Sequence, residues 1–85
     1  MSDIGYNDNV RVGNRTFHIQ TASNFSKGVA RCEVFEEGRL ITSQAVDFER
    51  RKKKNEESLE NRIRKTVSSL HQDTVSEIDL MFMFA

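Results

Sequence analysis

The sequence predicts an α+β domain in which a four-stranded antiparallel β-meander, built from two hairpins, is followed by one long C-terminal α-helix. Residues 9–48 alternate apolar and polar side chains, which is the period of strands with one buried face. From about residue 56 the apolar side chains recur every three or four positions, which is the period of a helix with one buried stripe. Because the chain has only 85 residues, we expect residues 1–85 to form a single domain.

The first hairpin is predicted to turn at Gly13-Asn14. Val10 and Val12 alternate with polar residues before this turn, and Phe17 and Ile19 do so after it. A two-residue connection that contains glycine favours a tight turn, because glycine accepts the positive φ that such a turn needs. The turn places Val10 opposite Phe17, so all four apolar side chains share one face of the sheet.

The second hairpin is predicted over residues 29–36 and 39–48, with its turn at Glu37-Gly38. Pairing across this turn predicts a face of small and apolar side chains that suits the close approach of a helix: Ala30, Cys32, Val34, Ile41, Ser43 and Ala45. The opposite face is polar in its middle and apolar at its ends, where it carries Val29, Phe35, Leu40 and Val46. The absence of proline from the chain agrees with uninterrupted strands.

The helix is predicted over residues 56–82, after Asn55, whose residue type caps helix N-termini. Its apolar stripe has one polar member and consists of Leu59, Ile63, Val67, Leu70, Thr74, Ile78 and Met81. Such a helix is roughly 40 Å long at about 1.5 Å per residue, whereas strands of eight to ten residues span only about 26–34 Å. A continuous helix therefore extends past its own sheet. The alternative is a break near Asp73-Thr74, followed by a second short element.

Two segments lie outside the predicted elements. We expect residues 1–8 to be disordered and residues 49–55 to form a connector with five consecutive bases: Arg50, Arg51, Lys52, Lys53 and Lys54. Such a run could contact the phosphates of nucleic acid or an anionic surface. However, glutamates flank the run, no aromatic residue is interleaved to stack on a base, and the chain has no net charge. We therefore favour a solvated connector and keep nucleic-acid or anionic-surface binding as the weaker alternative.

No pattern of catalytic, cofactor-binding or metal-ligating residues stands out, so we expect neither an enzyme nor a cofactor. The thiol of Cys32 falls between apolar neighbours on the predicted helix-facing side, where it acts as a small core residue rather than a nucleophile. His18 points away from the apolar face, and no other ligand type stands near it at the spacing of a metal site. His71 borders the apolar stripe of the helix, and whether His18 and His71 share a site stays open.

The C-terminus predicts self-association. Residues 80–84 are all large and apolar, so they would cover every side of a helix and could not all face one sheet. One helix on one sheet also leaves the mixed face of the second hairpin uncovered, and a symmetric homodimer would bury both surfaces. The candidate self-association residues are Val29, Phe35, Leu40, Val46, Ile78, Met81, Phe82 and Phe84.

Three motifs carry a resemblance to a known group: Gly13-x-x-x-Phe17-His18-Ile19-Gln20-Thr21, Phe35-x-x-Gly38-x-Leu40-x-x-Ser43, and a C-terminal helix that contains His71. Over residues 9–72 the chain resembles a family of small, uncharacterised bacterial proteins with a Phe-His-[Val/Ile]-Gln-Thr strand, a Gly-turn hairpin and a His-containing helix. The sequence departs from that family in reading Leu70-His71-Gln72 in place of Gln-His, and in its apolar C-terminus. The resemblance implies a bacterial, soluble, single-domain protein and implies no activity.

The remaining sequence features concern the compartment. A single cysteine cannot form an internal disulfide, no apolar run reaches the roughly 18 residues of a membrane span, and the N-terminus lacks the basic and apolar regions of a secretory signal. We therefore expect a cytoplasmic protein. The function that the sequence favours is a non-enzymatic, self-associating protein-interaction module, with an unidentified protein as a possible further partner.

Overall fold

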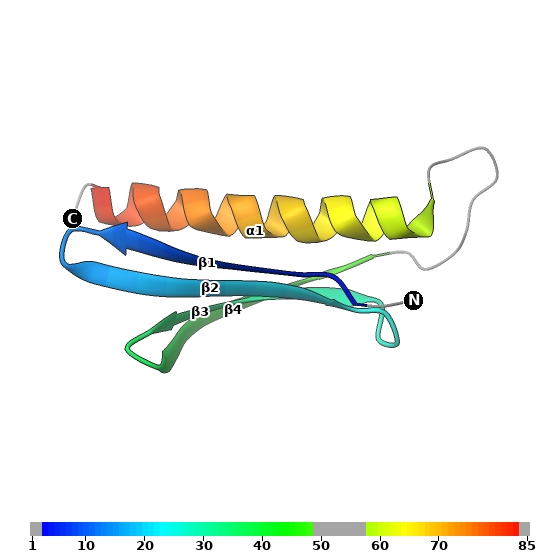
Figure 1. Cartoon of the computed structure of the whole chain (residues 1–85), viewed down its shortest axis with the longest axis horizontal. Coiled ribbons are helices and arrows are strands. Elements are labelled where there is room, and N and C mark those ends of the chain that lie inside the picture. The colour runs from blue at the N-terminus through cyan, green and yellow to red at the C-terminus, as the bar shows by residue number, and fades with distance from the viewer. Residues whose placement is uncertain (1–2, 49–57, 84–85) are drawn as a thin grey trace.

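The computed structural model describes residues 3–48 and 58–83 and confirms the predicted α+β fold. Its strands form one antiparallel sheet in the order β1-β2-β3-β4, and the helix lies across one face of that sheet (Figure 1). The elements are β1 (Gly5–Val12), β2 (Arg15–Asn24), β3 (Val29–Glu36), β4 (Arg39–Asp47) and α1 (Leu59–Met83).

The first hairpin has the predicted register, with Val10 opposite Phe17 across a turn in which Gly13 has a φ of 62°. Its first strand, however, begins at Gly5, so the prediction that residues 1–8 are disordered is wrong for residues 5–8. The physical reason is a set of contacts distant in sequence. Tyr6 and Asp8 face α1 and contact His71, which no local pattern in a polar segment could indicate.

The second hairpin turns at Glu37-Gly38 as predicted, and both turn residues have positive φ values of 50° and 77°. Beyond the turn its register differs from the prediction. Phe35 pairs with Leu40, but Val34 pairs with Thr42, so Ile41 is the extra residue of a β-bulge.

The bulge reverses the facing of the rest of β4. Ala30 and Cys32 pair with Val46 and Gln44, not with Ala45 and Ser43 as predicted. Since successive side chains of a strand point to opposite faces, Gln44 and Val46 lie on the helix side of the sheet. Ser43 and Ala45 lie on the outer side.

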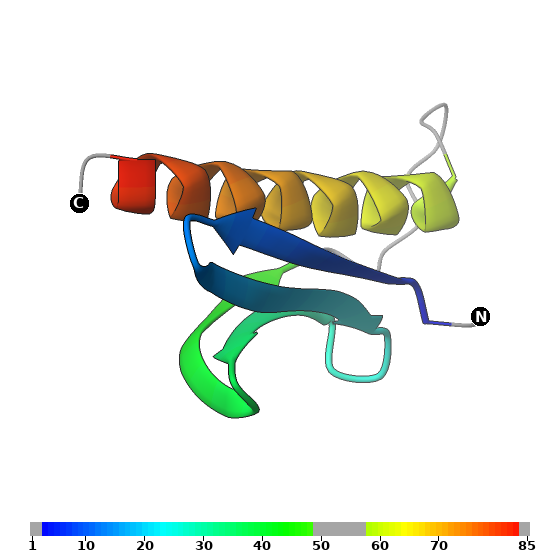
Figure 2. The same ribbon diagram turned by 60° about the vertical axis from the view of Figure 1, so that its left-hand side comes forward.

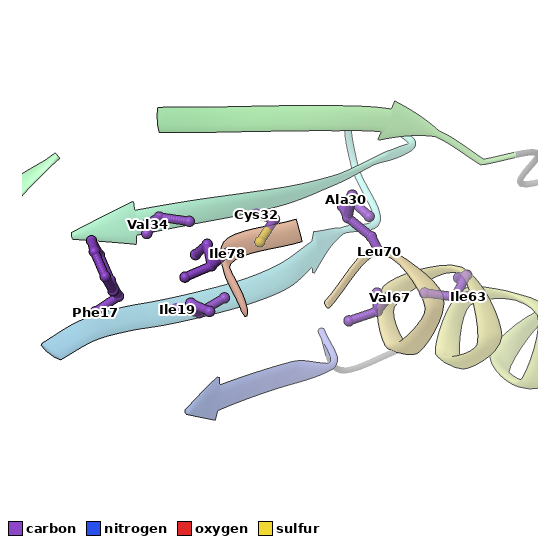
Figure 3. Close-up of a cluster of buried hydrophobic side chains, with 9 residues drawn as sticks. All are labelled: Phe17, Ile19, Ala30, Cys32, Val34, Ile63, Val67, Leu70 and Ile78. Carbon is purple, nitrogen blue, oxygen red and sulfur yellow. The ribbon is translucent and has the colours of Figure 1, made fainter. Parts of the chain in front are cut away.

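The core lies between α1 and the helix-facing side of β2 and β3, as Figure 3 shows. Its members are Phe17, Ile19, Ala30, Cys32, Val34, Ile63, Val67, Leu70 and Ile78. The predicted helix stripe is therefore confirmed from Ile63 to Ile78, whereas Met81 is 64% exposed. Thr74, the polar member of the stripe, is also buried, and its hydroxyl is satisfied there because it donates to the backbone carbonyl of Leu70 at 2.8 Å.

The helix is continuous from Leu59 to Met83, so the alternative break near Asp73 is wrong. Its N-cap is Ser58, whose hydroxyl oxygen accepts a hydrogen bond from the backbone N–H of Asn61 at 3.2 Å. The predicted cap, Asn55, falls outside the described residues. With 25 residues α1 is about 37 Å long, and its N-terminal end lies beyond the ends of the strands in both views (Figures 1 and 2).

The helix covers only part of the sheet. It packs against β1, β2 and β3, while the β3–β4 hairpin curves away from it at its tip (Figure 2). All nine residues of β4 are exposed. The fold therefore leaves one strand open to solvent at the edge of the sheet.

Candidate functional site: the open edge of the sheet

The strand β4 is the last strand of the sheet and has β3 as its single neighbour among the described residues. Its sequence is Arg-Leu-Ile-Thr-Ser-Gln-Ala-Val-Asp, so the only charges are Arg39 at the start and Asp47 at the end. The uncharged stretch 40–46 includes β-branched residues that favour extended structure. The side chains of Leu40, Ile41 and Val46 are 52%, 46% and 42% exposed.

The backbone of β4 presents unpaired hydrogen-bonding groups to solvent. The N–H of Phe48, just past the strand, donates to the carbonyl of Gly28 at 2.9 Å. Residues of an antiparallel strand bond alternately to one neighbour and to the other. Counting back from Phe48, the even residues 42–46 bond to β3, whereas Ser43, Ala45 and Asp47 direct their N–H and C=O groups toward the open edge.

The helix-facing side of β4 continues the surface of α1. Gln44 donates from Nε2 to Oε2 of Glu77 on α1 at 3.4 Å. Val46 lies in a shallow depression beside the helix, whose other lining residues are Lys65, Thr66, Ser69, Leu70 and Asp73. Five of the six residues that line this depression belong to α1, and Val46 is the one that β4 contributes.

The other edge of the sheet, formed by β1, is protected against the addition of a further strand. The strand β1 carries Asp8, Arg11 and two asparagines, residue types that disfavour the addition of a further strand. It is also packed against α1, to which Asp8 is hydrogen-bonded. Proteins commonly protect an edge strand with charges, prolines or a covering element. In β4 the bulge at Ile41 is such a feature, but it lies near the turn and leaves residues 42–47 regular.

The structure separates the residues that the sequence assigned to self-association. Val29 and Phe35 lie half-buried on the outer face of the sheet at opposite ends of β3, and exposed Leu40 pairs with Phe35. Val46 was predicted to share that face but lies on the helix side because of the bulge. Ile78 is only 5% exposed within the core of its own chain, so it is not available to a second copy.

The three remaining candidates lie at the C-terminal end of α1. Met81 is exposed, and its neighbour Leu80 is 57% exposed. The side chain of Phe82 and the whole of Phe84 fall outside the described residues.

The second notable site is a buried polar network between α1 and the sheet. His71 is 1% exposed, and its Nδ1 lies 2.7 Å from Oγ1 of Thr21, which is itself 1% exposed. Its Nε2 lies 2.5 Å from Oδ2 of Asp8, and the ring of Tyr6 lies 5.8 Å away between centroids. Because a carboxylate only accepts hydrogen bonds, we assign the ring proton to Nε2, and the Thr21 hydroxyl then donates to Nδ1.

This arrangement of a hydroxyl, an imidazole and a carboxylate resembles the order of groups in a nucleophilic triad. The hydroxyl of Thr21 is buried in the interface between helix and sheet, where no substrate can reach it. The network therefore joins α1 to β1 and β2 as a structural element. His71 borders the apolar stripe as its position in the sequence predicts, whereas its partners Thr21 and Asp8 are too distant in sequence to be predicted.

His18 lies on the opposite face of the sheet from His71, so the two residues share no site. Its Nδ1 lies 3.0 Å from Oδ1 of Asn9, and its ring is tilted against that of Phe35 at 6.5 Å between centroids. A polar groove of about 590 Å³ surrounds it near the two hairpin turns, and Thr16 and Glu36 are among its lining residues. The groove is open and contains no buried unpaired group that would mark a ligand.

At the rim of this groove Arg15 and Glu36 form a two-fold hydrogen-bonded ion pair, with both distances 2.6 Å. The hydrogen bond with Glu36 raises the pKa of Arg15, and the same bond lowers the pKa of Glu36. Both groups are solvent-accessible, so the pair contributes little to stability. The guanidinium also lies over the ring of Phe17 at 5.0 Å.

The other sequence candidates have no partners that indicate chemistry. Cys32 is buried and unbridged in the core. Within residues 3–48 and 58–83, no three His, Cys, Asp or Glu side chains are grouped as metal ligands would be. The basic run of residues 50–54 lies outside the described residues.

Comparisons with protein-family models, with curated proteins and with solved structures give no match for this chain. In the part of the chain that the structure describes, no helix combines the length and apolar character needed to cross a membrane.

Proposed function

We propose that this chain is a protein-interaction module that acts by accepting an extended strand along β4. In strand addition the main-chain hydrogen bonds supply affinity, and the side chains that flank the added strand supply selectivity. The observation that carries the proposal is that the β4 edge is exposed, uncharged and unpaired among the described residues. The strand is exposed along its whole length, is uncharged from residue 40 to residue 46, and directs the backbone groups of Ser43, Ala45 and Asp47 to solvent.

The proposal involves no catalytic residue, cofactor or metal. It also includes the cytoplasm as the compartment, because a buried, unbridged cysteine suits a reducing environment. Nucleic-acid or anionic-surface binding was the alternative from sequence. It depends on residues 50–54, and no contact of the described residues favours it.

The experiment uses a soluble nine-residue peptide of alternating threonine and valine, with a lysine at each end, as the added strand. Amide hydrogen exchange of the full chain is measured by NMR with and without this peptide. We expect the peptide to slow exchange at the edge-facing amides of Ser43 and Ala45. Fast exchange of both amides that persists at millimolar peptide would overturn the proposal.

A proline at residue 45 provides the matched test of mechanism. The N–H of Ala45 points to the open edge, so Ala45→Pro removes no hydrogen bond to β3 while it blocks an incoming strand. We expect this variant to fold and to lose the effect of the peptide at Ser43, whereas Ala45→Thr keeps it. Protection of Ser43 that survives in folded Ala45→Pro would show that the peptide binds elsewhere and would contradict strand addition.

A further inference from the structure

We propose that the strand accepted by β4 is β4 of a second copy of this chain, paired antiparallel about a two-fold axis perpendicular to the sheet. The two four-stranded sheets then form one continuous eight-stranded sheet, with the order β1-β2-β3-β4 in each half. The inference rests on the proposed function and specifies its partner. Contacts of this kind are self-complementary, because the same surface serves on both subunits.

The charges of β4 select this partner and this orientation. Arg39 begins the strand, Asp47 ends it, and no charge lies between them. When two copies pair antiparallel, Arg39 of one copy lies at the same end of the seam as Asp47 of the other, and symmetry repeats the arrangement at the opposite end. Because of the bulge, Arg39 points to the helix side, opposite Glu36, and Asp47 points to the outer side, opposite Val29, so the two charges attract at the strand ends without forming a direct ion pair. Parallel pairing would instead bring like charges together at both ends.

The backbone of the strand fits the same arrangement. Residues 42–47 follow the bulge with a regular register. Within that stretch Ser43 and Ala45 direct N–H and C=O groups outward near the middle of the strand, so they can exchange hydrogen bonds with the same residues of a second copy. The chain has no net charge, so two copies experience no overall repulsion as they approach.

The uncovered helix-facing side of β4 gives a second reason. A two-fold axis perpendicular to the sheet keeps both α1 helices on the same face. The side chains of Thr42, Gln44 and Val46 from each copy then line the floor between the two helices. In the single chain Val46 is 42% exposed beside α1, and the second copy closes the open side of its depression.

The experiment measures the mass of the full chain by sedimentation equilibrium between micromolar and hundreds of micromolar concentrations. We expect a dimer of twice the 9.8 kDa chain mass. Arg39→Asp and Asp47→Arg each place like charges at both ends of the seam, and each should raise the dimer Kd by about threefold, because the charges are exposed and lie on opposite faces of the sheet. An equimolar mixture of the two variants should restore the wild-type Kd, because opposite charges meet again in the mixed dimer.

The control variant is Arg11→Asp on the β1 edge, which changes the net charge as Arg39→Asp does but should leave the Kd unchanged. A dimer that is indifferent to both charge reversals, or a mixture that stays as weak as its components, would show that another surface is used and would overturn the inference. A single-chain mass at every concentration would also overturn it. If the threonine–valine peptide still protects Ser43 in that case, strand acceptance stands without self-pairing; if it does not, both proposals fail.

Discussion

The buried contact between His71 and Thr21 provides the most quantitative test of how helix and sheet are held together. Each of these side chains is 1% exposed, and the imidazole Nδ1 and the threonine hydroxyl are joined at 2.7 Å. Thr21→Val keeps the shape of the side chain but leaves Nδ1 buried without a partner, which costs about 1–3 kcal/mol. His71→Leu likewise leaves the Thr21 hydroxyl buried without its hydrogen-bond partner, which costs about 1–3 kcal/mol before any packing defect is added.

The double variant should cost much less than the sum of the two single variants. With valine and leucine together no polar atom of the pair is left unsatisfied, and Asp8 is exposed enough for water to solvate its carboxylate. We therefore expect a coupling energy of about 1–3 kcal/mol in a double-mutant cycle. The assay is urea unfolding of the four proteins at one protein concentration, with the m value checked for constancy.

A matched control comes from Thr66, whose hydroxyl donates to the carbonyl of Arg62 in its own helix and which is not a neighbour of His71 at the i, i+3 or i, i+4 spacing. Thr66→Val combined with His71→Leu should show no coupling beyond about 0.5 kcal/mol. If the effects of Thr21→Val and His71→Leu add within the same margin, the hydrogen bond between them does not stabilise the fold, and the reasoning is refuted.

Three further predictions test individual elements. Ser58→Ala removes the helix N-cap and should cost about 1 kcal/mol in urea unfolding, whereas an unchanged midpoint would mean that α1 is capped by another residue. Ile78→Ala should cost about 2–5 kcal/mol because the side chain is in the core, and exposed Met81→Ala should cost under about 0.5 kcal/mol; equal effects would contradict the assigned helix face. The hydrogen bond with Arg15 lowers the pKa of Glu36. The ion pair therefore stabilises the fold at pH values above the ordinary glutamate pKa, and this contribution is lost as the pH falls through the lowered pKa. Glu36→Gln should therefore reduce the acid dependence of stability in that range, and an identical pH profile would contradict a role for the pair.

The parts of the fold that sequence could predict are those set by local pattern. The hairpin turns at Gly13-Asn14 and Glu37-Gly38 need positive φ, and both have it. The helix stripe from Ile63 to Ile78 follows the period of its apolar residues and is buried as expected. Met81 falls on the same stripe but is exposed, which the period of the apolar residues alone could not reveal.

The features that sequence could not predict depend on contacts between distant residues. Nothing in Leu40-Ile41-Thr42 distinguishes a bulge from a regular strand, yet the bulge decides which face Val46 occupies. Tyr6 and Asp8 lie in a polar segment and join the sheet through contacts with His71, which is 63 residues from Asp8 in the sequence. Ser58 and Asn55 are both good N-cap types, and the observed helix starts after Ser58.

Part of the candidate site, the β4 edge, can be recognised in the sequence. An uncharged, β-prone stretch between one basic and one acidic residue is visible in residues 39–47. The large apolar side chains that suggest self-association in the sequence are a different set, and one of them, Ile78, belongs to the core. That β4 lies at an edge, and that α1 leaves it uncovered, follows only from the three-dimensional arrangement.

Amide hydrogen exchange along β4 at two protein concentrations tests most directly whether this edge pairs with another copy. In the single chain the amides of Gln44 and Val46 bond to β3 and should exchange slowly, while those of Ser43 and Ala45 should exchange quickly. At hundreds of micromolar we expect slow exchange at all four positions. Fast exchange at Ser43 and Ala45 that persists unchanged at the high concentration would contradict it.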